Sequence, residues 1–454
     1  MTIEVVGFEP FFFMSKPQRQ NVQQYVNIPF TNISMQHATK KKKIKANAVH
    51  VDHRNIVGID IGKRKHAATA ITPKGTVIAS LTHFENNRSG VDLLERQVLV
   101  PATNRSKPMI ALEATGQYWN AIHDELERRG YSCVVLNPIQ TGQRGKQRIR
   151  RTKTDRLDSA LIARTILAGD AQATLVPDEP MYELRLLVRH RWRLIKTHGM
   201  MLRYAIGLMD RVFPEYEDVF SKPFLSSVRT LIREIGLTPD VLVVKKKEVR
   251  ATLEKASKKK LSTAVIDELL LRASKSIGTR QGMDVVNGQL RTIVDYFDFV
   301  EKQVEQIDEK LRSRMESLQS PILSLGVGPV IAATILAESG AVEKFAGPCE
   351  YSAFCGLDPS VFDSGDSING VSHISKRGSP LLRWALYMAA QTVVKKHHDF
   401  TRIYERHLKN QPKGKRQKGH RYALIAVAHK VARVVWRLMK DGRKFTKRPP
   451  KRSV

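Results

Sequence analysis

Apolar residues recur with two different periods along the chain, and the period changes near residue 178. Before that point, short runs of β-branched and other apolar residues are separated by turn residues, which is typical of strands. The predicted strands are 56–62, 67–71, 76–81, 109–113 and 133–136. Helical patterns at 118–129 and 154–168 flank the last of these strands. The order of the elements predicts an α/β fold, with three antiparallel strands followed by a strand–helix–strand unit.

From about residue 178 the chain is helical and poor in strands. Between Leu290 and Leu311 the apolar residues recur in alternating steps of three and four, the spacing of a coiled-coil seam. The seam residues are Leu290, Ile293, Phe297, Val300, Val304, Ile307 and Leu311. A long amphipathic core helix has the same spacing, so both interpretations stay open. A Lys-rich run at 245–260 is expected to be a solvated helix face or a linker.

The last predicted unit begins near residue 320. A Gly-rich turn at 325–329 precedes an apolar helix at 330–337 and resembles half of a helix-hairpin-helix. Glycines let backbone N–H groups approach a phosphate, but such a turn also precedes many helices that bind nothing. Ser379 and Pro380 are expected to start a further helix, because Ser caps helix N-termini and Pro suits the first helical position.

These patterns divide the chain into five parts. The first is a basic extension that we expect to be disordered at least in part, because its apolar residues show no period. A mixed α/β domain, a mainly helical middle, a C-terminal domain and a basic helical region with a tail follow. The predicted bounds are 1–53, 54–177, 178–319, 320–400 and 401–454.

The chain carries a large excess of positive charge. It has 76 Lys and Arg against 44 Asp and Glu, a formal net charge of +32 in 454 residues. Nucleic acid is the favoured partner, because phosphate neutralisation releases counterions. The three cysteines form no CxxC pair, which fits a reducing cytoplasm and indicates no zinc site. No apolar run approaches the ~18 residues that span a bilayer, so we expect no membrane partner.

Four acids stand out by their positions in the predicted elements. Asp60 and Glu113 end strands, and Asp155 and Asp158 lie three residues apart at the start of a helix. Such carboxylates can converge at one sheet edge and bind Mg²⁺ or Mn²⁺, which suits phosphoryl transfer. Each has a simpler interpretation. Asp60 could be a turn residue, Glu113 a solvated strand end, and the two helical acids could favour the helix dipole.

Two further groups of residues suggest contact with phosphates. A basic loop precedes the helix that carries the two aspartates, and its cations are Arg144, Lys146, Arg148, Arg150, Arg151 and Lys153. A polar loop around Ser364 precedes the cations Lys376, Arg377 and Arg383. A serine there could attack a phosphodiester. The residues alone do not distinguish Ser364 from its neighbours Ser360, Ser367, Ser372 and Ser375.

In combination and in order, these motifs resemble one family. Six segments are similar to the DEDD transposases of bacterial and archaeal insertion sequences, which are relatives of the Piv invertase. The segments are VGIDIGKRKHAATAI, IALEATG, KTDRLDSALIA, SLGVGPVIAATILAESG, FAGPCEYSAFCGLDPSVFDSGD and ISKRGSPLLRWAL. The similarity runs from about 55 to 395. It implies an RNase H-like (RuvC-like) first domain and a C-terminal transposase domain. The N-terminal extension and the Lys-rich run depart from the pattern.

The resemblance also implies functional roles. Asp60, Glu113, Asp155 and Asp158 would be the metal-binding acids, and Ser364 would be the nucleophile that becomes joined to DNA. The implied partners are donor and target DNA, a structured bridge RNA and further copies of the chain, in a dimer or tetramer. The implied location is the prokaryotic cytoplasm, at the nucleoid when the protein acts.

Two other function classes remain as alternatives. An actin-like ATPase or sugar kinase uses a GxDxG hairpin similar to residues 58–62, although no second phosphate loop is evident and +32 is unusual for that class. A non-catalytic nucleic-acid-binding protein could use the Gly-rich turn at 325–329. ATP turnover without DNA would favour the first, and metal-independent DNA binding without strand breakage would favour the second.

Overall fold

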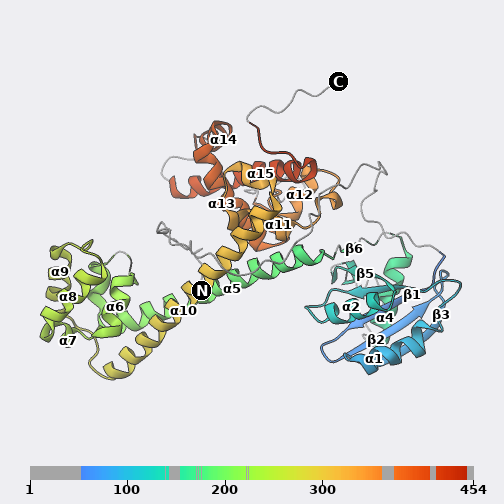
Figure 1. Ribbon diagram of the computed structural model, residues 1–454, viewed down its shortest axis with the longest axis horizontal. Coiled ribbons are helices and arrows are strands. Elements are labelled where there is room, and N and C mark those ends of the chain that lie inside the picture. The colour runs from blue at the N-terminus through green and yellow to red at the C-terminus, as the bar shows by residue number, and fades with distance from the viewer. Residues whose placement is uncertain are drawn as a thin grey trace, which may run out of the picture. The chain divides into compact units, whose positions relative to one another are not determined.

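A computed structural model of the chain describes residues 53–446 with gaps at 139, 143–153, 170, 172, 175, 221, 223, 360–372 and 410–415. The chain divides into two compact units (Figure 1). Over the described residues, the helical unit comprises 183–320 and 328–334, and the other unit holds the rest. No helix in these described ranges is long and apolar enough to cross a membrane.

A six-stranded mixed sheet forms the centre of the N-terminal domain. The strands are β1 (Ile56–Ile61), β2 (Lys65–Ile71), β3 (Val77–Glu85), β4 (Met109–Glu113), β5 (Ser132–Leu136) and β6 (Ala173–Thr174), in the order β3-β2-β1-β4-β5-β6. β1 pairs antiparallel with β2 and parallel with β4, and β4 pairs parallel with β5. The five predicted strands are confirmed. The two-residue β6 was not predicted, because its pairing with β5 is all that defines it.

Helices cover both faces of this sheet. The helical segments are α1 (Arg88–Leu94), a π-helix that continues it (Glu95–Leu99), α2 (Trp119–Arg128) and α4 (Asp155–Leu167). α1 and α2 contribute to the core on one face, and α4 packs on the other face against Ile56, Ile71 and Met109. The predicted helices around α2 and α4 are confirmed, whereas α1 and its π-helical continuation were not expected.

α4 lies unusually close to the central strand because Gly58 has no side chain. A Cβ atom at Gly58 would be 2.1 Å from the carbonyl oxygen of Ser159 and 2.6 Å from the amide nitrogen of Ala163. Beside Gly58 on β2, the hydroxyl of Thr69 lies 2.8 Å from the hydroxyl of Ser159. The register of α4 on the sheet is therefore set by a backbone contact and a buried hydrogen bond.

Two long helices run side by side in the helical unit (Figure 1). They are α5 (Glu179–Val212) and α10 (Met283–Leu318), and ion pairs show that they are antiparallel. Arg314 donates to Glu183 at 2.7 Å, and Arg191 donates to Asp308 at 3.0 Å. All seven seam residues between 290 and 311 are buried within this single chain, as expected for an amphipathic core helix. That the seam joins two chains stays a prediction.

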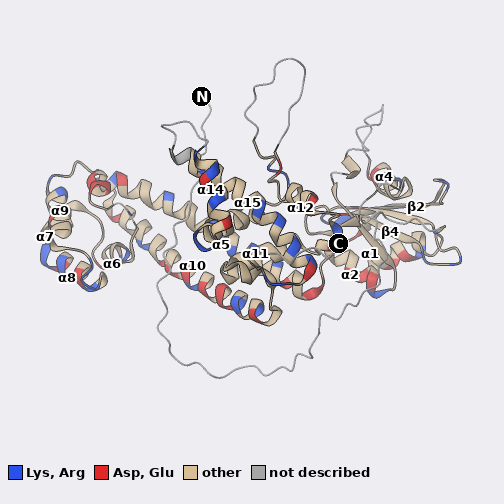
Figure 2. Cartoon of the chain, turned by 90° about the horizontal axis from the view of Figure 1, so that it is seen from above, with Lys and Arg blue, Asp and Glu red and all other residues tan. Residues whose placement is uncertain are grey.

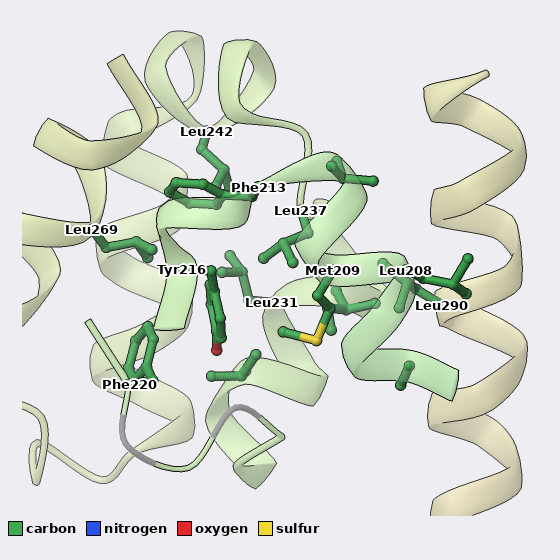
Figure 3. Close-up of a cluster of buried hydrophobic side chains, with 14 of the residues drawn as sticks. Leu208, Met209, Phe213, Tyr216, Phe220, Leu231, Leu237, Leu242, Leu269 and Leu290 are labelled. Carbon is green, nitrogen blue, oxygen red and sulfur yellow. The ribbon is translucent and has the colours of Figure 1, made fainter. Parts of the chain in front are cut away.

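A bundle of short helices connects α5 to α10. Its helices are a 3₁₀ segment (Pro214–Asp218), α6 (Ser226–Glu234), α7 (Pro239–Val244), α8 (Lys246–Ala256) and α9 (Thr263–Ser274). The aromatic side chains of Phe213, Tyr216 and Phe220 lie in their shared core (Figure 3). The Lys-rich run 245–260 forms the exposed face of α8 and the turn after it, so the prediction of a solvated helix face is confirmed.

Helices also build the C-terminal region. They are a 3₁₀ segment (Pro321–Leu325), α11 (Pro329–Ser339), a second 3₁₀ segment (Val342–Lys344), α12 (Pro348–Phe354), α13 (Pro380–Lys396), α14 (His398–Lys409) and α15 (Arg416–Asp441). α13 packs against α14 and α15. The helices expected after the Gly-rich turn and after Ser379 are both present, and the Ser379 side chain accepts a hydrogen bond from the amide of Leu382 at 3.3 Å.

The contact at Gly58 generates a stability prediction. Gly58→Ala should lower the free energy of unfolding of the sheet domain by about 1–3 kcal/mol, because the new methyl group has to push α4 away from β1. Gly207→Ala is the control. Gly207 lies exposed inside α5 with no neighbouring atom within 4 Å of a built Cβ, so alanine there should stabilise by about 0.5–1 kcal/mol. Urea unfolding measures both, and an unchanged Gly58→Ala transition would contradict the contact.

Candidate active site

Asp60 and Glu113 lie side by side at the end of two parallel strands. β1 and β4 pair in register up to Ile59 and Leu112, and each acid is the next residue of its strand. Side chains alternate between the faces of a strand, so Asp60 shares a face with Ile56 and Gly58, and Glu113 shares one with Met109. Both acids therefore lie on the face that α4 covers. Asp60 belongs to β1 itself, so its interpretation as a turn residue is wrong.

The turn after Asp60 is held by a buried histidine. The amide of Gly62 donates to Nδ1 of His66 at 3.2 Å, and a Cβ on Gly62 would be 2.3 Å from the carbonyl oxygen of Lys65. Burial lowers the pKa of His66, with an opposing contribution from Asn86. The neutral imidazole keeps the Nδ1 lone pair that accepts this bond. The chain direction directly after Asp60 is thus fixed by packing.

The first turn of α4 reaches the same edge of the sheet. Ile162 and Ile166 pack over the start of β1, so the helix begins at the opposite end of that strand. A carboxylate oxygen of Asp155 lies 3.9 Å from Nδ1 of His83 on β3. His83 directly precedes Phe84, the β3 residue that pairs with His66. Thr154 caps the helix by accepting from the amide of Leu157 at 3.4 Å. Asp155 and Asp158 therefore lie at the edge that carries Asp60 and Glu113.

The hydrogen-bond partners of Glu113 come from two threonines. Thr141 lies 2.9 Å from one carboxylate oxygen of Glu113, and Thr115 lies 3.3 Å from the other. The Thr141 hydroxyl is also 3.0 Å from the carbonyl oxygen of Pro138. Sequence reasoning missed Thr141, because nothing in the residues around it signals a contact with a strand end 28 positions earlier.

The donor set fits a hard divalent cation in its chemistry. Four carboxylates lie toward the same end of the sheet, and oxygen ligands are those that Mg²⁺ and Mn²⁺ prefer. Among the residues that the structure describes, however, no three His, Cys, Asp or Glu side chains are close enough together to hold one ion. The fold places the acids toward a common end of the sheet, but it does not bring three of their side chains within reach of one ion. Side-chain rotation or a bound phosphate would have to complete the coordination.

Two of the predicted phosphate-binding groups lie outside the described residues. One is the basic loop with Arg144, Lys146, Arg148, Arg150, Arg151 and Lys153, and the other is the loop with Ser364. The structure does describe the residues that flank both loops. The basic loop ends one residue before Thr154, the cap of α4. It is thus tied in sequence to the helix that carries Asp155 and Asp158.

The base of the Ser364 loop is a small closed structure. Pro359 and Ile374 form an isolated antiparallel bridge, and the amide of Ser375 donates to the carbonyl of Asp358 at 2.8 Å. The Ser375 hydroxyl also donates to the Asp358 carboxylate. The Ser375 side chain thus helps to join the two ends of the loop.

Three cations follow this base, and they are not equivalent. Arg383 donates to the carbonyl of Cys355 at 3.3 Å and to that of Arg377 at 3.4 Å, and burial lowers the pKa of its guanidinium. It holds the turn before α13 together. Lys376 and Arg377 are exposed, and Lys376 has a positive φ of 54°. The exposed pair is thus better placed than Arg383 to contact a phosphate.

A histidine that sequence reasoning missed lies near the same base. His429 is a half-buried residue of α15, and α15 packs against α12. Burial lowers the pKa of His429, the charge of Arg433 acts in the same direction, and Asp358 opposes them. A neutral imidazole can accept a proton. No sequence signal could have found it, because Asp358 and His429 are distant in the chain.

Two family models match the chain. Residues 57–214 match the DEDD transposase model of the IS110 group, described as "Transposase", and residues 324–405 match "Transposase IS116/IS110/IS902 family". The first segment contains the four acids, and the second contains Ser364 and the three cations after it. Residues 215–323 lie between the two matches.

Similar proteins come from several bacteria. The 44.8 kDa protein of insertion element IS116 from Streptomyces clavuligerus is 26% identical over 405 residues, which cover 87% of this chain and 96% of that protein. The transposase for insertion sequence element IS1111A of Coxiella burnetii is 23% identical over 85% of this chain and 89% of its own. The pilin gene-inverting protein of Moraxella lacunata is 30% identical over 24% of this chain and 34% of its own.

The cap of α13 generates the next prediction. The Ser379 hydroxyl donates to the buried Glu338 carboxylate at 2.7 Å and accepts from the Leu382 amide. Ser379→Ala removes both bonds and should lower the free energy of unfolding of the C-terminal region by about 1–3 kcal/mol. Ser379→Thr keeps the hydroxyl and should lose less. Urea unfolding followed by circular dichroism measures the difference, and equal stability of the two variants would refute the role of the hydroxyl.

Proposed function

The chain belongs to the IS116/IS110/IS902 family of transposases, and on that premise we propose that it cuts and rejoins DNA to move an insertion sequence. The proposal is supported by Asp60 and Glu113 at the ends of two paired parallel strands and by Asp155 and Asp158 in the first turn of α4. All four lie within the segment that matches the DEDD transposase model. The net charge of +32 supports a polyanionic substrate. In this proposal DNA is the substrate, and the enzyme acts on two DNA sites, the donor and the target.

The acid edge would hold Mg²⁺ or Mn²⁺. Asp60 and Glu113 would bind from the strands, and Asp155 and Asp158 from α4. The ion would supply polarisation of a phosphate and stabilisation of the charge that develops on it. The protein's own part is to position the carboxylates: the backbone contact at Gly58 fixes α4, and Thr141 orients Glu113. Outer hydrogen bonds of this kind determine how well a carboxylate presents its lone pairs.

Ser364 would supply the nucleophile. Its oxygen bonds to the phosphorus while the bond from that phosphorus to a deoxyribose oxygen breaks, so a phosphoserine link and a free DNA hydroxyl result. The serine loses its proton, and the leaving oxygen gains one. A hydroxyl of a second DNA end then attacks the phosphoserine and releases the enzyme. Lys376 and Arg377 would neutralise the phosphate, and Arg383 would hold their turn.

The basic loop before α4 would bind the DNA backbone beside the acids. The proposal also includes a structured bridge RNA as a guide and assembly of the chain into a dimer or tetramer, and it places the working enzyme at the nucleoid in the cytoplasm. Both matched models are transposase models, so the alternative of an actin-like ATPase or sugar kinase receives no support. Strand cleavage distinguishes the proposal from a non-catalytic nucleic-acid-binding protein.

The first test replaces one metal-binding acid. Asp60→Asn should reduce strand exchange by at least about 100-fold and leave DNA binding intact, because an amide binds Mg²⁺ poorly but keeps the shape of the side chain. The control is Asp124→Asn, an exposed aspartate of α2. Recombination is measured over a series of Mg²⁺ concentrations. Full activity of Asp60→Asn at limiting Mg²⁺ would overturn the metal site.

The second test traps the nucleophile. Labelled substrate DNA is incubated with protein and metal, and the mixture is denatured. The label should stay on the chain, should be lost in Ser364→Ala and should be kept in Ser367→Ala, a serine of the same loop. An adduct that survives Ser364→Ala would move the nucleophile to another residue. Active protein without any adduct would point to direct attack by water or a DNA hydroxyl.

A further inference from the structure

We propose that lysines at the two ends of α8 form a surface that binds the backbone of double-stranded DNA outside the reacting sites. The α8 lysine surface consists of Lys245, Lys246, Lys247, Lys255, Lys258, Lys259 and Lys260. It lies between the two segments that the family models match. The inference rests on the proposal that the chain acts on DNA, and it adds a separate contact to that function.

The cations of the helical unit fall into two groups. Several of its arginines are paired with acids and join the helices: Arg229 donates to Asp298 at 2.8 Å and to Glu301 at 2.9 Å, and Arg250 of α8 pairs with Asp267 of α9. The lysines of the surface differ. Within the described part of the chain, only Lys245 of the seven has an ion pair, with Glu248 at 3.2 Å. Packing therefore does not explain these lysines.

Two of the lysines lie where a helix disfavours positive charge. Lys246 and Lys247 are the first two residues of α8, and Lys245, its N-cap, is at the same time the C-cap of α7. The N-terminus of a helix carries a partial positive charge, so cations there are destabilising and anions stabilising. The Lys245 side chain makes no capping bond. A phosphate at this end would relieve the repulsion among the lysines and meet the exposed helix amides.

The other end of α8 shows a second unusual arrangement. Lys258 and Lys259 both have positive φ angles, 53° and 59°, and all three lysines from Lys258 to Lys260 are exposed. Gly or Asn adopts this left-handed conformation at lower cost, so the backbone gives no reason for lysine at either position. The tight turn spreads consecutive ammonium groups over the surface, where they can contact different phosphates.

The spacing of the two ends suits a duplex. α8 has 11 residues, so its ends lie roughly 16 Å apart at ~1.5 Å per residue. Duplex DNA carries one charge per about 1.7 Å of axis, so this length of duplex contains roughly ten phosphates on its two strands. Between the ends, Lys246, Lys247 and Arg250 lie on one face of α8 together with Ala251 and Glu254. The view in Figure 2 shows Lys and Arg gathered on α8.

The side-chain chemistry indicates backbone contact without sequence preference. Lysine is a flexible point charge, whereas base recognition and bidentate phosphate contacts favour the arginine fork. The arginine that shares this helix, Arg250, is engaged by Asp267. We therefore assign the surface to DNA that flanks the reacting sites, which it would hold regardless of sequence.

The experiment uses the full chain and three variants that each lose two charges. Two double variants alter the two ends of α8. One combines Lys246→Gln with Lys247→Gln, and the other combines Lys259→Gln with Lys260→Gln. Lys302→Gln with Lys310→Gln, on the exposed face of α10, is the matched control. Glutamine has a helix propensity close to that of lysine, and thermal unfolding verifies that each variant folds. The probes are two DNA duplexes of about 30 base pairs with unrelated sequences, and an RNA hairpin of similar charge.

The dependence of DNA affinity on salt is the readout. Each α8 variant should lower the slope of log Kd against log salt by about 1–2, because each lost phosphate contact removes about 0.9, and the two duplexes should respond equally. The control should keep the wild-type slope. Wild-type slopes in both α8 variants would overturn this inference but would leave the proposed function standing. A loss confined to the RNA hairpin would also overturn it. A wild-type chain that binds no DNA would instead overturn the proposed function.

Discussion

The contact between α4 and Gly58 is the constraint on which the acid edge depends. Two of the four acids belong to strands whose pairing fixes them, but the other two belong to a helix that is free to slide unless something determines its register. A backbone-to-backbone approach leaves no room for sliding, since Ser159 and Ala163 already lie against the strand. The Thr69–Ser159 hydrogen bond adds direction to this contact. A glycine two residues before Asp60 thereby determines where Asp155 and Asp158 lie.

Positive charge is used in two distinct ways across the molecule. In the helical unit, arginines face acids across helix pairs, such as Arg191 with Asp308 and Arg314 with Glu183, and each pair selects one alignment of α5 against α10. An exposed ion pair such as Arg314–Glu183 adds little stability, so its contribution is mainly to specify register. Apart from the pair of Lys245 with Glu248, the α8 lysine surface has no ion pair within the described residues. Part of the excess positive charge therefore lies on lysines that form no ion pair within the described fold.

Local patterns predicted most of the secondary structure, and tertiary contacts account for what they missed. The strands and the cap Ser379 were predictable because alternation and capping are encoded within a few residues. The seam from 290 to 311 predicted a helix correctly but could not reveal its partner, since the same spacing serves a second chain or a neighbouring helix. The hydrogen bond of Glu113 with Thr141 and the electrostatic interaction of Asp358 with His429 join distant positions. The four acids could be predicted to share an edge, but their separation at that edge could not.

The proposed division of the chemistry between an acid edge and a serine would conserve the energy of the DNA backbone bond. Four carboxylates at one edge repel one another, and a cation that joins them can polarise a phosphate but cannot keep a DNA end. Hydrolysis by water would release that end and lose the energy of the phosphodiester bond. A serine ester retains a phosphorus–oxygen bond of similar energy, so rejoining needs no external energy source. A nucleophile on the chain itself would keep that energy, and the proposal assigns this role to Ser364, which lies in sequence between Asp358 and Ser375, the two residues joined at the base of the loop.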